Sequence, residues 1–340
     1  MRRIVVMGGL GFFGSLAVQR LRADGAQALT AARRPGADLQ IDVEDPVSLR
    51  AGLRPGDVVI DTVGPFQDRS LALLDAALEV GCDLVDIADS RAYVARIYER
   101  RPQIDAKGIR VLTACSSISA ISAALVRASA VASPVRVTGF LAPATRFAAN
   151  PGSGGSLLRS VGHPIRVLRD GRLVTRLGWS ESRAFAMPPP IGATRGYLYE
   201  TADVVTLPSI WPSLRTVEFY VDSRVPGLNL AFSVMARSAA LQALAARFMR
   251  PGLAVARALG STVGCLAFEI EAPGDTLARY ALVGSKYGHF TPIAPAVLAA
   301  RAIAEGRFQP VGLVPAHQQV EPDELLGYLK GLGIASIRQT

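Results

Sequence analysis

Residues 3–14, with the sequence RIVVMGGLGFFG, decide the fold of the N-terminal part of this chain. A short apolar run, residues 3–7, precedes glycines at positions 9, 11 and 14 in the spacing G-x-G-x-x-G, and a helical segment, residues 12–23, follows. This spacing serves a tight turn, a close backbone approach to a pyrophosphate, and close helix–strand packing. Amides at the helix start then face the phosphates. The motif predicts a dinucleotide-binding loop, and a purely structural glycine turn is the alternative. The expected cofactor contacts in it are Gly8, Gly9, Gly11, Phe12, Phe13 and Gly14.

Strand-like and helical patterns alternate through residues 1–130. The further strand-like runs are 28–32, 58–61, 84–87 and 109–113, and the helical segments between them are 46–53, 70–80 and 91–105. Alternation at these lengths indicates βαβ units. We therefore expect an α/β fold with a doubly wound, parallel Rossmann-type sheet, which binds its ligand at the carboxyl ends of the strands.

The end of the second strand-like run bears on the choice of cofactor. NAD-binding domains usually carry Asp or Glu there to accept hydrogen bonds from the ribose 2′-hydroxyl. This chain has Arg33 and Arg34 instead, and two guanidinium groups suit a 2′-phosphate. Asp42 is expected at the edge of the adenine site. The pattern favours NADP(H) over NAD(H), and the alternative is that the two arginines only flank a surface turn.

The pattern changes near residue 131, where Gly-, Pro- and Ser-rich stretches separate short strand-like pieces. Residues 265–271 and 276–283 are expected to form an antiparallel hairpin around the turn at 272–275. We expect a second, α+β domain with a largely antiparallel sheet over residues 131–284, for substrate binding or dimerisation. Residues 1–130 form the first domain, and residues 285–340 are expected to return to it.

Net charge is concentrated in the middle of the chain. The whole sequence of 340 residues has a formal charge of +9, and residues 131–270 hold 15 arginines against 7 acidic residues. This excess predicts an anion-binding face, with an ordinary solvated surface as the alternative. The scattered arginines form no recognised nucleic-acid module, so we expect no nucleic-acid partner.

A basic amphipathic helix is predicted over residues 238–259, with a break at Pro251-Gly252. Arg247, Arg250 and Arg257 fall on one side of it, which leaves a broad apolar face. We expect that face to be buried in the domain core, and peripheral contact with a membrane is the alternative. The expected ligand of the middle domain is anionic or lipid-like.

Other classes of protein fit poorly. Half of the residues are hydrophobic, which excludes a disordered chain. Three cysteines without C-x-x-C spacing and three histidines predict neither a disulfide framework nor a metal site. We expect no signal peptide, and no uncharged run is longer than residues 111–126, which fall short of the ~20 residues of a membrane span. The expected location is the cytoplasm, and homo-oligomer formation stays open.

Four motifs carry a resemblance to a known family. They are Gly9-x-Gly11-Phe-Phe-Gly14, the strand end at 30–34, Asp61-Thr-Val-Gly-Pro-Phe66, and the strand at 82–89. Together they resemble the saccharopine dehydrogenase-like oxidoreductases over residues 1–125, and more weakly from 284 to 332. The middle region has no motif of the true saccharopine reductases. The resemblance implies an NADP-binding domain in which Val63, Gly64, Pro65 and Phe66 lie beside the nicotinamide.

Candidates for acid–base catalysis are few. No Tyr-x-x-x-Lys pair and no G-x-S-x-G motif occurs, which argues against a short-chain dehydrogenase and a serine hydrolase. Lys286, Tyr287 and His289 are weak candidates on one loop. The sequence predicts an NADP(H)-dependent oxidoreductase that transfers hydride to or from a C=N, C=O or C=C bond of a small molecule. A non-catalytic NADP(H)-binding regulator and a lipid- or membrane-surface protein stay open as alternatives.

Overall fold

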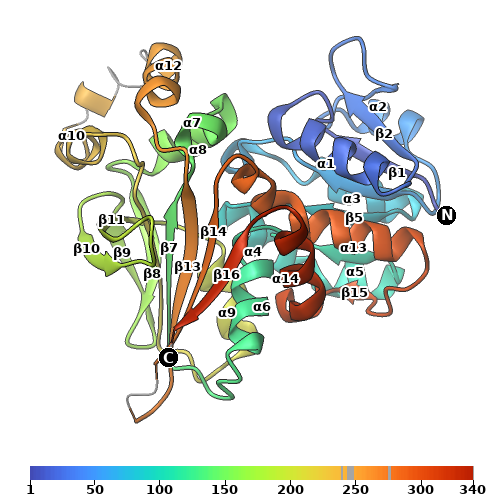
Figure 1. Cartoon of the computed structure of the whole chain (residues 1–340). Helices are drawn as coiled ribbons and strands as arrows, with labels where there is room; N and C mark the ends of the chain where they lie inside the picture. The colour runs from blue at the N-terminus through green and yellow to red at the C-terminus, as the bar shows by residue number, and fades with distance from the viewer. Residues whose placement is uncertain (239, 243–248, 275–276, 340) are drawn as a thin grey trace. The chain divides into compact units, whose positions relative to one another are not determined.

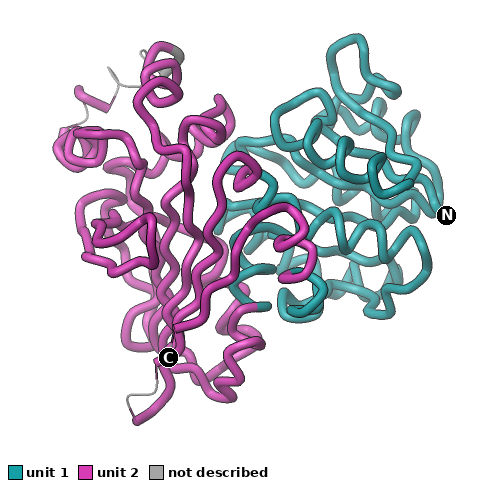
Figure 2. Tube along the Cα trace, in the orientation of Figure 1, with its two compact units in different colours: residues 1–124, 290–325 teal, residues 125–289, 326–340 magenta. Residues whose placement is uncertain are grey.

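The structure is a computed structural model of the whole chain, and it describes residues 1–340 except 239, 243–248, 275–276 and 340. The chain forms two compact units (Figure 2). Unit 1 comprises Met1–Ala124 and Phe290–Leu325, and unit 2 comprises Leu125–His289 and Leu326–Thr340. Each unit is built around its own β-sheet.

Unit 1 contains a parallel sheet in the order β15-β6-β5-β4-β1-β2-β3 (Figure 1). Its strands are β1 (Ile4–Met7), β2 (Ala28–Ala32), β3 (Leu39–Gln40), β4 (Val58–Asp61), β5 (Asp83–Asp86), β6 (Arg110–Leu112) and β15 (Gly312–Leu313). Apart from β15, this order is that of the dinucleotide-binding Rossmann fold, whose strand order reverses between β1 and β4. The predicted doubly wound parallel sheet is therefore confirmed.

Helices connect and cover these strands. They are α1 (Phe12–Ala23), α2 (Pro46–Gly52), α3 (Ala72–Val80), α4 (Arg91–Glu99), α5 (Arg101–Lys107), α6 (Ala120–Ala128) and α13 (Ala294–Ala304), with short 3₁₀ turns η1 (Phe66–Asp68), η2 (Gly288–Ile293) and η3 (Ala316–Gln318). The buried side of α1 has the spacing of an amphipathic helix, with Gly14, Ala17, Val18 and Leu21 turned to the sheet. Helix α13 packs beside α1 and against β4 and β5 (Figure 1).

Unit 2 contains a mixed, mostly antiparallel sheet in the order β10-β11-β12-β7-β13-β14-β16, with β8 paired to β12 and to β9. Its strands are β7 (Arg136–Ala142), β8 (Pro164–Arg169), β9 (Arg172–Leu177), β10 (Ser182–Ala186), β11 (Ala193–Tyr199), β12 (Thr216–Val221), β13 (Gly264–Glu271), β14 (Leu277–Gly284) and β16 (Ala335–Gln339). Buried Phe140, Leu198 and Tyr220 belong to the core on one face of this sheet. The predicted α+β domain with a largely antiparallel sheet is confirmed, including the pairing of β13 with β14.

The remaining helices belong to unit 2 or lead into it. They are α7 (Thr145–Ala148), α8 (Pro151–Ser160), α9 (Asp203–Ile210), α10 (Leu228–Met235), α12 (Met249–Leu259) and α14 (Pro322–Gly331). No helix among the described residues is long and apolar enough to span a bilayer.

The last part of the chain differs from the predicted domain division. The prediction assigned all of residues 285–340 to the first domain, whereas β16 lies in the sheet of unit 2. Its Ala335–Gln339 backbone pairs with β14, where Ala335 is the partner of Val283. The return to the first unit therefore covers Phe290–Leu325, and the other boundary falls within α6, at Ala124, rather than at residue 130.

Helix α12 corrects two further expectations. It runs through Pro251-Gly252, so the predicted break there is wrong. The apolar face is also only partly buried, because Val255 and Leu259 are 51% and 60% exposed although Ala256 is buried. Of the earlier part of the predicted helix, residues 239 and 243–248, and Arg247 with them, lie outside the described residues.

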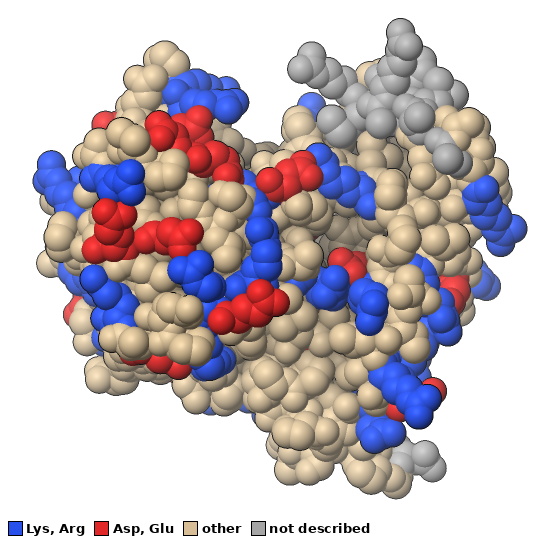
Figure 3. All heavy atoms as spheres, turned by 180° about the vertical axis from the view of Figure 1, so that it is seen from behind, with Lys and Arg blue, Asp and Glu red and all other residues tan. Residues whose placement is uncertain are grey.

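Several arginines of unit 2 have acidic partners. Arg169 pairs with Glu181 at 2.7 Å and with Glu218, and Arg183 pairs with Glu269 at 2.6 Å. Figure 3 shows basic side chains spread among uncharged ones on the visible face rather than gathered in one block. The local pairs neutralise part of the basic excess, and a general anion-binding face stays a prediction.

Candidate dinucleotide-binding site

The glycine loop between β1 and α1 begins with a tight turn. Gly8 has a φ of +75°, its N–H donates to the carbonyl of Ala31 at 2.8 Å, and the Gly11 N–H returns to the Gly8 carbonyl at 2.7 Å. A left-handed residue at this point favours glycine, because a Cβ atom is strained there. The residue that makes the turn is thus Gly8, one position before Gly9, the first glycine of the G-x-G-x-x-G pattern.

Two other glycines allow close packing of the backbone. A Cβ atom on Gly9 would lie 2.8 Å from the Cα of Thr30 in β2, and one on Gly14 would lie 2.1 Å from the Gly8 carbonyl oxygen. Both distances are too short for any side chain. Gly9 therefore lets the loop pass against β2, and Gly14 lets α1 begin directly on the loop.

The N-terminus of α1 opens at this loop. Gly11 is the N-cap residue in an extended conformation, and no side chain caps the helix. The rings of Phe12 and Phe13 meet edge to face at 5.1 Å beside it. Uncapped amides at a helix start can bind an anion such as a phosphate, so this end of α1 has the chemistry that the motif requires.

The two arginines after β2 lie next to this loop. Arg34 reaches across to it, and its Nη2 donates to the carbonyl of Leu10 at 2.6 Å. The Arg33 side chain is 84% exposed, with its guanidinium 4.0 Å from the Asp42 carboxylate. The structure thus brings the predicted residues Arg33, Arg34 and Asp42 together at one end of the glycine loop, with guanidinium donors still available.

Asp38 is a carboxylate near this end of the site that the sequence interpretation overlooked. Its Oδ2 accepts hydrogen bonds from the Thr30 N–H and hydroxyl, both at 2.8 Å, and from Arg22 Nη2 at 2.9 Å. The hydrogen bonds from Thr30 lower the pKa of Asp38. Through these three hydrogen bonds on one oxygen, Asp38 closes the turn between β2 and β3.

The loop after β4 packs against the glycine loop. The Thr62 hydroxyl donates to the Met7 carbonyl at 2.7 Å, and a Cβ atom on Gly8 would lie 2.9 Å from the same hydroxyl oxygen. The predicted residues Val63, Gly64, Pro65 and Phe66 follow directly, and the Gly64–Pro65 peptide is cis. Unit 1 therefore places both predicted cofactor motifs side by side at the carboxyl ends of β1 and β4.

A buried ion pair, which sequence reasoning missed, holds the loop after β4. The Arg69 guanidinium lies 3.1 Å from the carboxylate of Asp61, the last residue of β4, and both side chains are buried. Arg69 Nη1 also donates to the Val63 carbonyl at 2.6 Å, and its Nε bonds Glu44. Burial raises the pKa of Asp61, and Arg69 opposes that rise. The sequence signal for a cationic partner was Asp61, an aspartate at the end of a buried strand.

A second buried carboxylate ties the ends of β5 and β6. Asp86 Oδ1 accepts hydrogen bonds from the N–H groups of Ala88 at 3.0 Å and Ala114 at 2.8 Å. The side chain is fully buried, and this burial raises the pKa of Asp86 to about 6. Asp86 therefore positions two loops at the edge where the candidate site lies.

The raised pKa of Asp86 predicts a pH-dependent stability. Because the folded value of about 6 exceeds the unfolded value of about 4, its contribution is complete below pH 4 and is lost as the pH rises through 6. Asp86→Asn stays neutral and can still accept both amides. We expect the variant to gain up to about 3 kcal/mol relative to the native chain between pH 4 and pH 7, measured by urea denaturation. A difference that is constant with pH would contradict this assignment.

The weak catalytic candidates lie together in unit 2, on the loop after β14. Lys286 Nζ is 5.6 Å from the ring centroid of Tyr287, and the rings of Tyr287 and His289 are 6.5 Å apart. Burial lowers the pKa of His289. A neutral imidazole beside a phenol and an ammonium is a reasonable acid–base set. The structure brings the three residues together, and their catalytic role stays a prediction.

Comparison with known proteins supports the fold. No protein-family model and no curated protein matches the sequence. Among solved structures, the apo saccharopine dehydrogenase (L-Glu forming) of Saccharomyces cerevisiae is similar over 100% of both chains, with a TM-score of 0.64 and 16% identity. The dehydrogenase MviM of Clostridium difficile matches with a TM-score of 0.41 and 7% identity, over 97% of this chain and 99% of its own.

The similarity to the saccharopine dehydrogenase defines the class of fold. It confirms the saccharopine dehydrogenase-like fold that the sequence motifs predicted, since it covers both units of the chain. At 16% identity it establishes the fold alone. A fold does not define an activity, which depends on the residues of the site.

Proposed function

We propose that this chain is an NADP(H)-dependent oxidoreductase that transfers hydride to or from a polarised C=N, C=O or C=C bond. The observation that carries the proposal is the hydrogen bond from the Arg34 side chain to the Leu10 carbonyl in the glycine loop. This contact lies beside the start of α1, which no side chain caps. In this fold the ligand site lies where the strand order reverses, which here is the space between β1 and β4. The saccharopine dehydrogenase-like fold supports the same activity class.

Each part of the site has a chemical task in this proposal. The Gly8–Gly14 loop and the first amides of α1 bind the pyrophosphate. Arg33 and Arg34 bind the 2′-phosphate through charge-assisted hydrogen bonds, and Asp42 lies beside them at the adenine edge. Residues 63–66, fixed by Arg69 and Asp61, border the nicotinamide half. The cofactor supplies the hydride chemistry, and the protein supplies binding and orientation.

Affinity for the two cofactors tests the proposal. We expect NADPH to bind more tightly than NADH, and the double variant Arg33→Ala/Arg34→Ala to weaken NADPH about ten- to a hundredfold, which corresponds to about 1.5–3 kcal/mol. NADH affinity should stay nearly constant. Isothermal titration calorimetry of both cofactors measures this, and Arg50→Ala, which removes another exposed arginine of unit 1, is the control. Equal affinities that are unchanged in the double variant would refute the assignment.

A non-catalytic NADP(H)-binding regulator is the second candidate. Two observations favour this candidate. The sequence has no Tyr-x-x-x-Lys pair, and its acid–base candidates Lys286, Tyr287 and His289 are weak. Oxidation of NADPH with a panel of carbonyl, imine and enoyl compounds separates the two candidates, since a regulator binds the cofactor but turns over none of them.

A further inference from the structure

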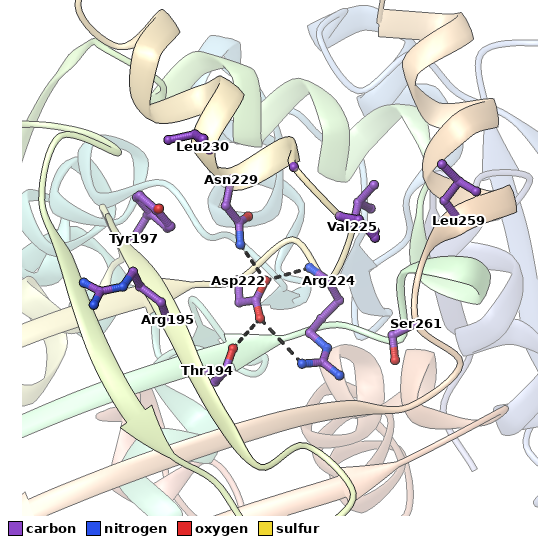
Figure 4. Close-up of a pocket in the computed structure, with 12 residues that line it drawn as sticks. Thr194, Arg195, Tyr197, Asp222, Arg224, Val225, Asn229, Leu230, Leu259 and Ser261 are labelled. Carbon is purple, nitrogen blue, oxygen red and sulfur yellow. Dashed lines mark hydrogen bonds and ion pairs between the residues drawn. The ribbon is translucent and has the colours of Figure 1, made fainter.

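Unit 2 contains a pocket of about 510 Å³ that the proposed cofactor site does not use (Figure 4). It lies between strand β11, the loop after β12, and helices α10 and α12. Residues that carry its chemistry are Thr194 and Tyr197 of β11, Asp222 and Arg224 after β12, Leu230 of α10 and Leu259 of α12. A volume of this size suits a small organic ligand.

Asp222 organises the polar side of the pocket. Its carboxylate accepts hydrogen bonds from the Thr194 hydroxyl at 2.6 Å, the Asn229 amide at 2.7 Å and the backbone N–H of Arg224 at 2.9 Å. These contacts converge in Figure 4. Three neutral donors thus already bond the Asp222 carboxylate. Its ion pair with the Arg224 guanidinium is longer, at 3.7 Å.

Arg224 has an unusual backbone for a residue with a side chain. Its φ is +55°, a left-handed conformation that costs free energy in any residue except glycine. Hydrogen bonds hold both of its backbone groups, since its N–H donates to Asp222 and its carbonyl accepts from the Ser261 N–H at 3.2 Å. Glycine would suit this position better, and the guanidinium group is what arginine adds to it.

The Arg224 guanidinium is short of acceptors. Its side chain is 23% exposed, and within the described part of the chain it makes no hydrogen bond, with the 3.7 Å pair to Asp222 as its ionic contact. Arginine has five donors, and no Arg224 nitrogen is among the buried atoms that lack a partner, so its guanidinium can be reached from solvent. The other arginine of the pocket, Arg195, points away from Asp222 in Figure 4 and donates to the Ser182 hydroxyl at 3.0 Å. Arg224 is therefore the cation that an incoming anion would meet.

Apolar side chains border the same pocket. Leu230 and Leu259 lie on opposite sides of the Asp222 cluster in Figure 4, and they are 66% and 60% exposed. Tyr197 is the aromatic wall, and its ring stacks on buried Trp179 at 5.4 Å. Exposed leucines beside a guanidinium group that makes no side-chain hydrogen bond among the described residues fit a ligand with both an anionic and an apolar part.

We propose that this pocket binds an amphipathic anion, a carboxylate or phosphate attached to an apolar chain or ring. Arg224 binds the oxyanion, and Leu230, Leu259 and Tyr197 contact the apolar part. The site lies wholly within unit 2, so the proposal does not rest on cofactor binding in unit 1.

Binding of simple probes tests the chemistry of the ligand. Octanoate and octyl phosphate represent the two sources of the anion, octanol is the neutral probe, and inorganic phosphate lacks the apolar part. We expect one or both octyl anions to bind at least tenfold more tightly than octanol and than inorganic phosphate, because a charge-assisted pair and an apolar contact act together. Tryptophan fluorescence reports binding through the Trp179–Tyr197 stack, and calorimetry confirms it.

The variant Arg224→Gly separates a binding role from a structural one. Glycine adopts a φ of +55° without strain, so the variant should melt at or above the native temperature while it loses at least tenfold in affinity for the octyl anion. Asp170→Gly relieves a similar φ of +50° in the β8–β9 turn, and Arg172→Gln removes an exposed arginine from β9. Both controls should bind the octyl anion as the native chain does.

Three results would overturn the proposal. The first is native affinity for the octyl anions in Arg224→Gly, and the second is equal binding of octanol. The third is binding to vesicles of anionic lipid in the absence of any binding of the free octyl anions. That last result would instead indicate a membrane-facing surface at the exposed residues of α10 and α12.

Discussion

Replacing Arg69 by methionine is expected to cost about 3–5 kcal/mol of unfolding free energy at pH 7. Arg69 is 6% exposed and Asp61 is fully buried, so the variant leaves a buried carboxylate without its cation. The loop after β4 loses support as well, because Arg69 no longer binds the Val63 carbonyl. Since protonation neutralises Asp61, the loss should become smaller as the pH falls through the raised pKa of this group. Urea denaturation at several pH values measures it.

Two further variants make this expectation specific. Arg50→Met breaks the exposed pair between Arg50 and Glu79, whose side chains are 46% and 57% exposed, and should cost less than about 1 kcal/mol. The double variant Asp61→Asn/Arg69→Met removes both charges and should recover part of the loss. If Arg69→Met were no more destabilising than Arg50→Met, the buried pair would not hold the loop.

Features of unit 1 that depend on short stretches of sequence could be predicted. The run before Gly8 and the glycine spacing defined β1, the loop and the start of α1, because each depends on neighbouring residues. The position of Arg34 beside the loop also followed, since β1 and β2 are adjacent in every sheet of this order. Local periodicity was therefore enough for the fold class and for the outline of the candidate site.

Contacts between distant residues could not be read from local patterns. Glu44 and Arg69 meet across 25 positions, and Thr194 and Asp222 across 28 positions, only because folding brings separate loops together. Strand β16 was missed because Ala335–Gln339 is short and mostly exposed, with Ile337 as its one large apolar residue, so its pairing with β14 leaves only a weak local signal. The exposure of Val255 and Leu259 was missed for a related reason, since periodicity shows that a face is apolar but not what covers it.

Alanine at position 14 is expected to destabilise unit 1 by about 3 kcal/mol or more, and to abolish cofactor binding with it. Its Cβ atom would lie 2.1 Å from the Gly8 carbonyl oxygen and 2.8 Å from the Thr62 hydroxyl oxygen. That carbonyl cannot simply withdraw, because it accepts the Gly11 N–H that closes the turn. The start of α1 must therefore move away from the loop, and the amides proposed to bind the pyrophosphate move with it.

Gly327→Ala is the matched control for this substitution. Gly327 also lies in a helix, α14, but it is exposed, and beyond the adjacent backbone of its own helix a Cβ atom there meets no described atom within 4 Å. Alanine in that open position should stabilise the chain by about 0.5–1 kcal/mol, because it lowers the entropy of the unfolded state and favours the helix. Urea denaturation and NADPH titration of both variants measure the contrast. Equal stability of Gly14→Ala and Gly327→Ala would mean that α1 does not pack on the loop as the structure places it, and the proposed pyrophosphate site would lose its geometric basis.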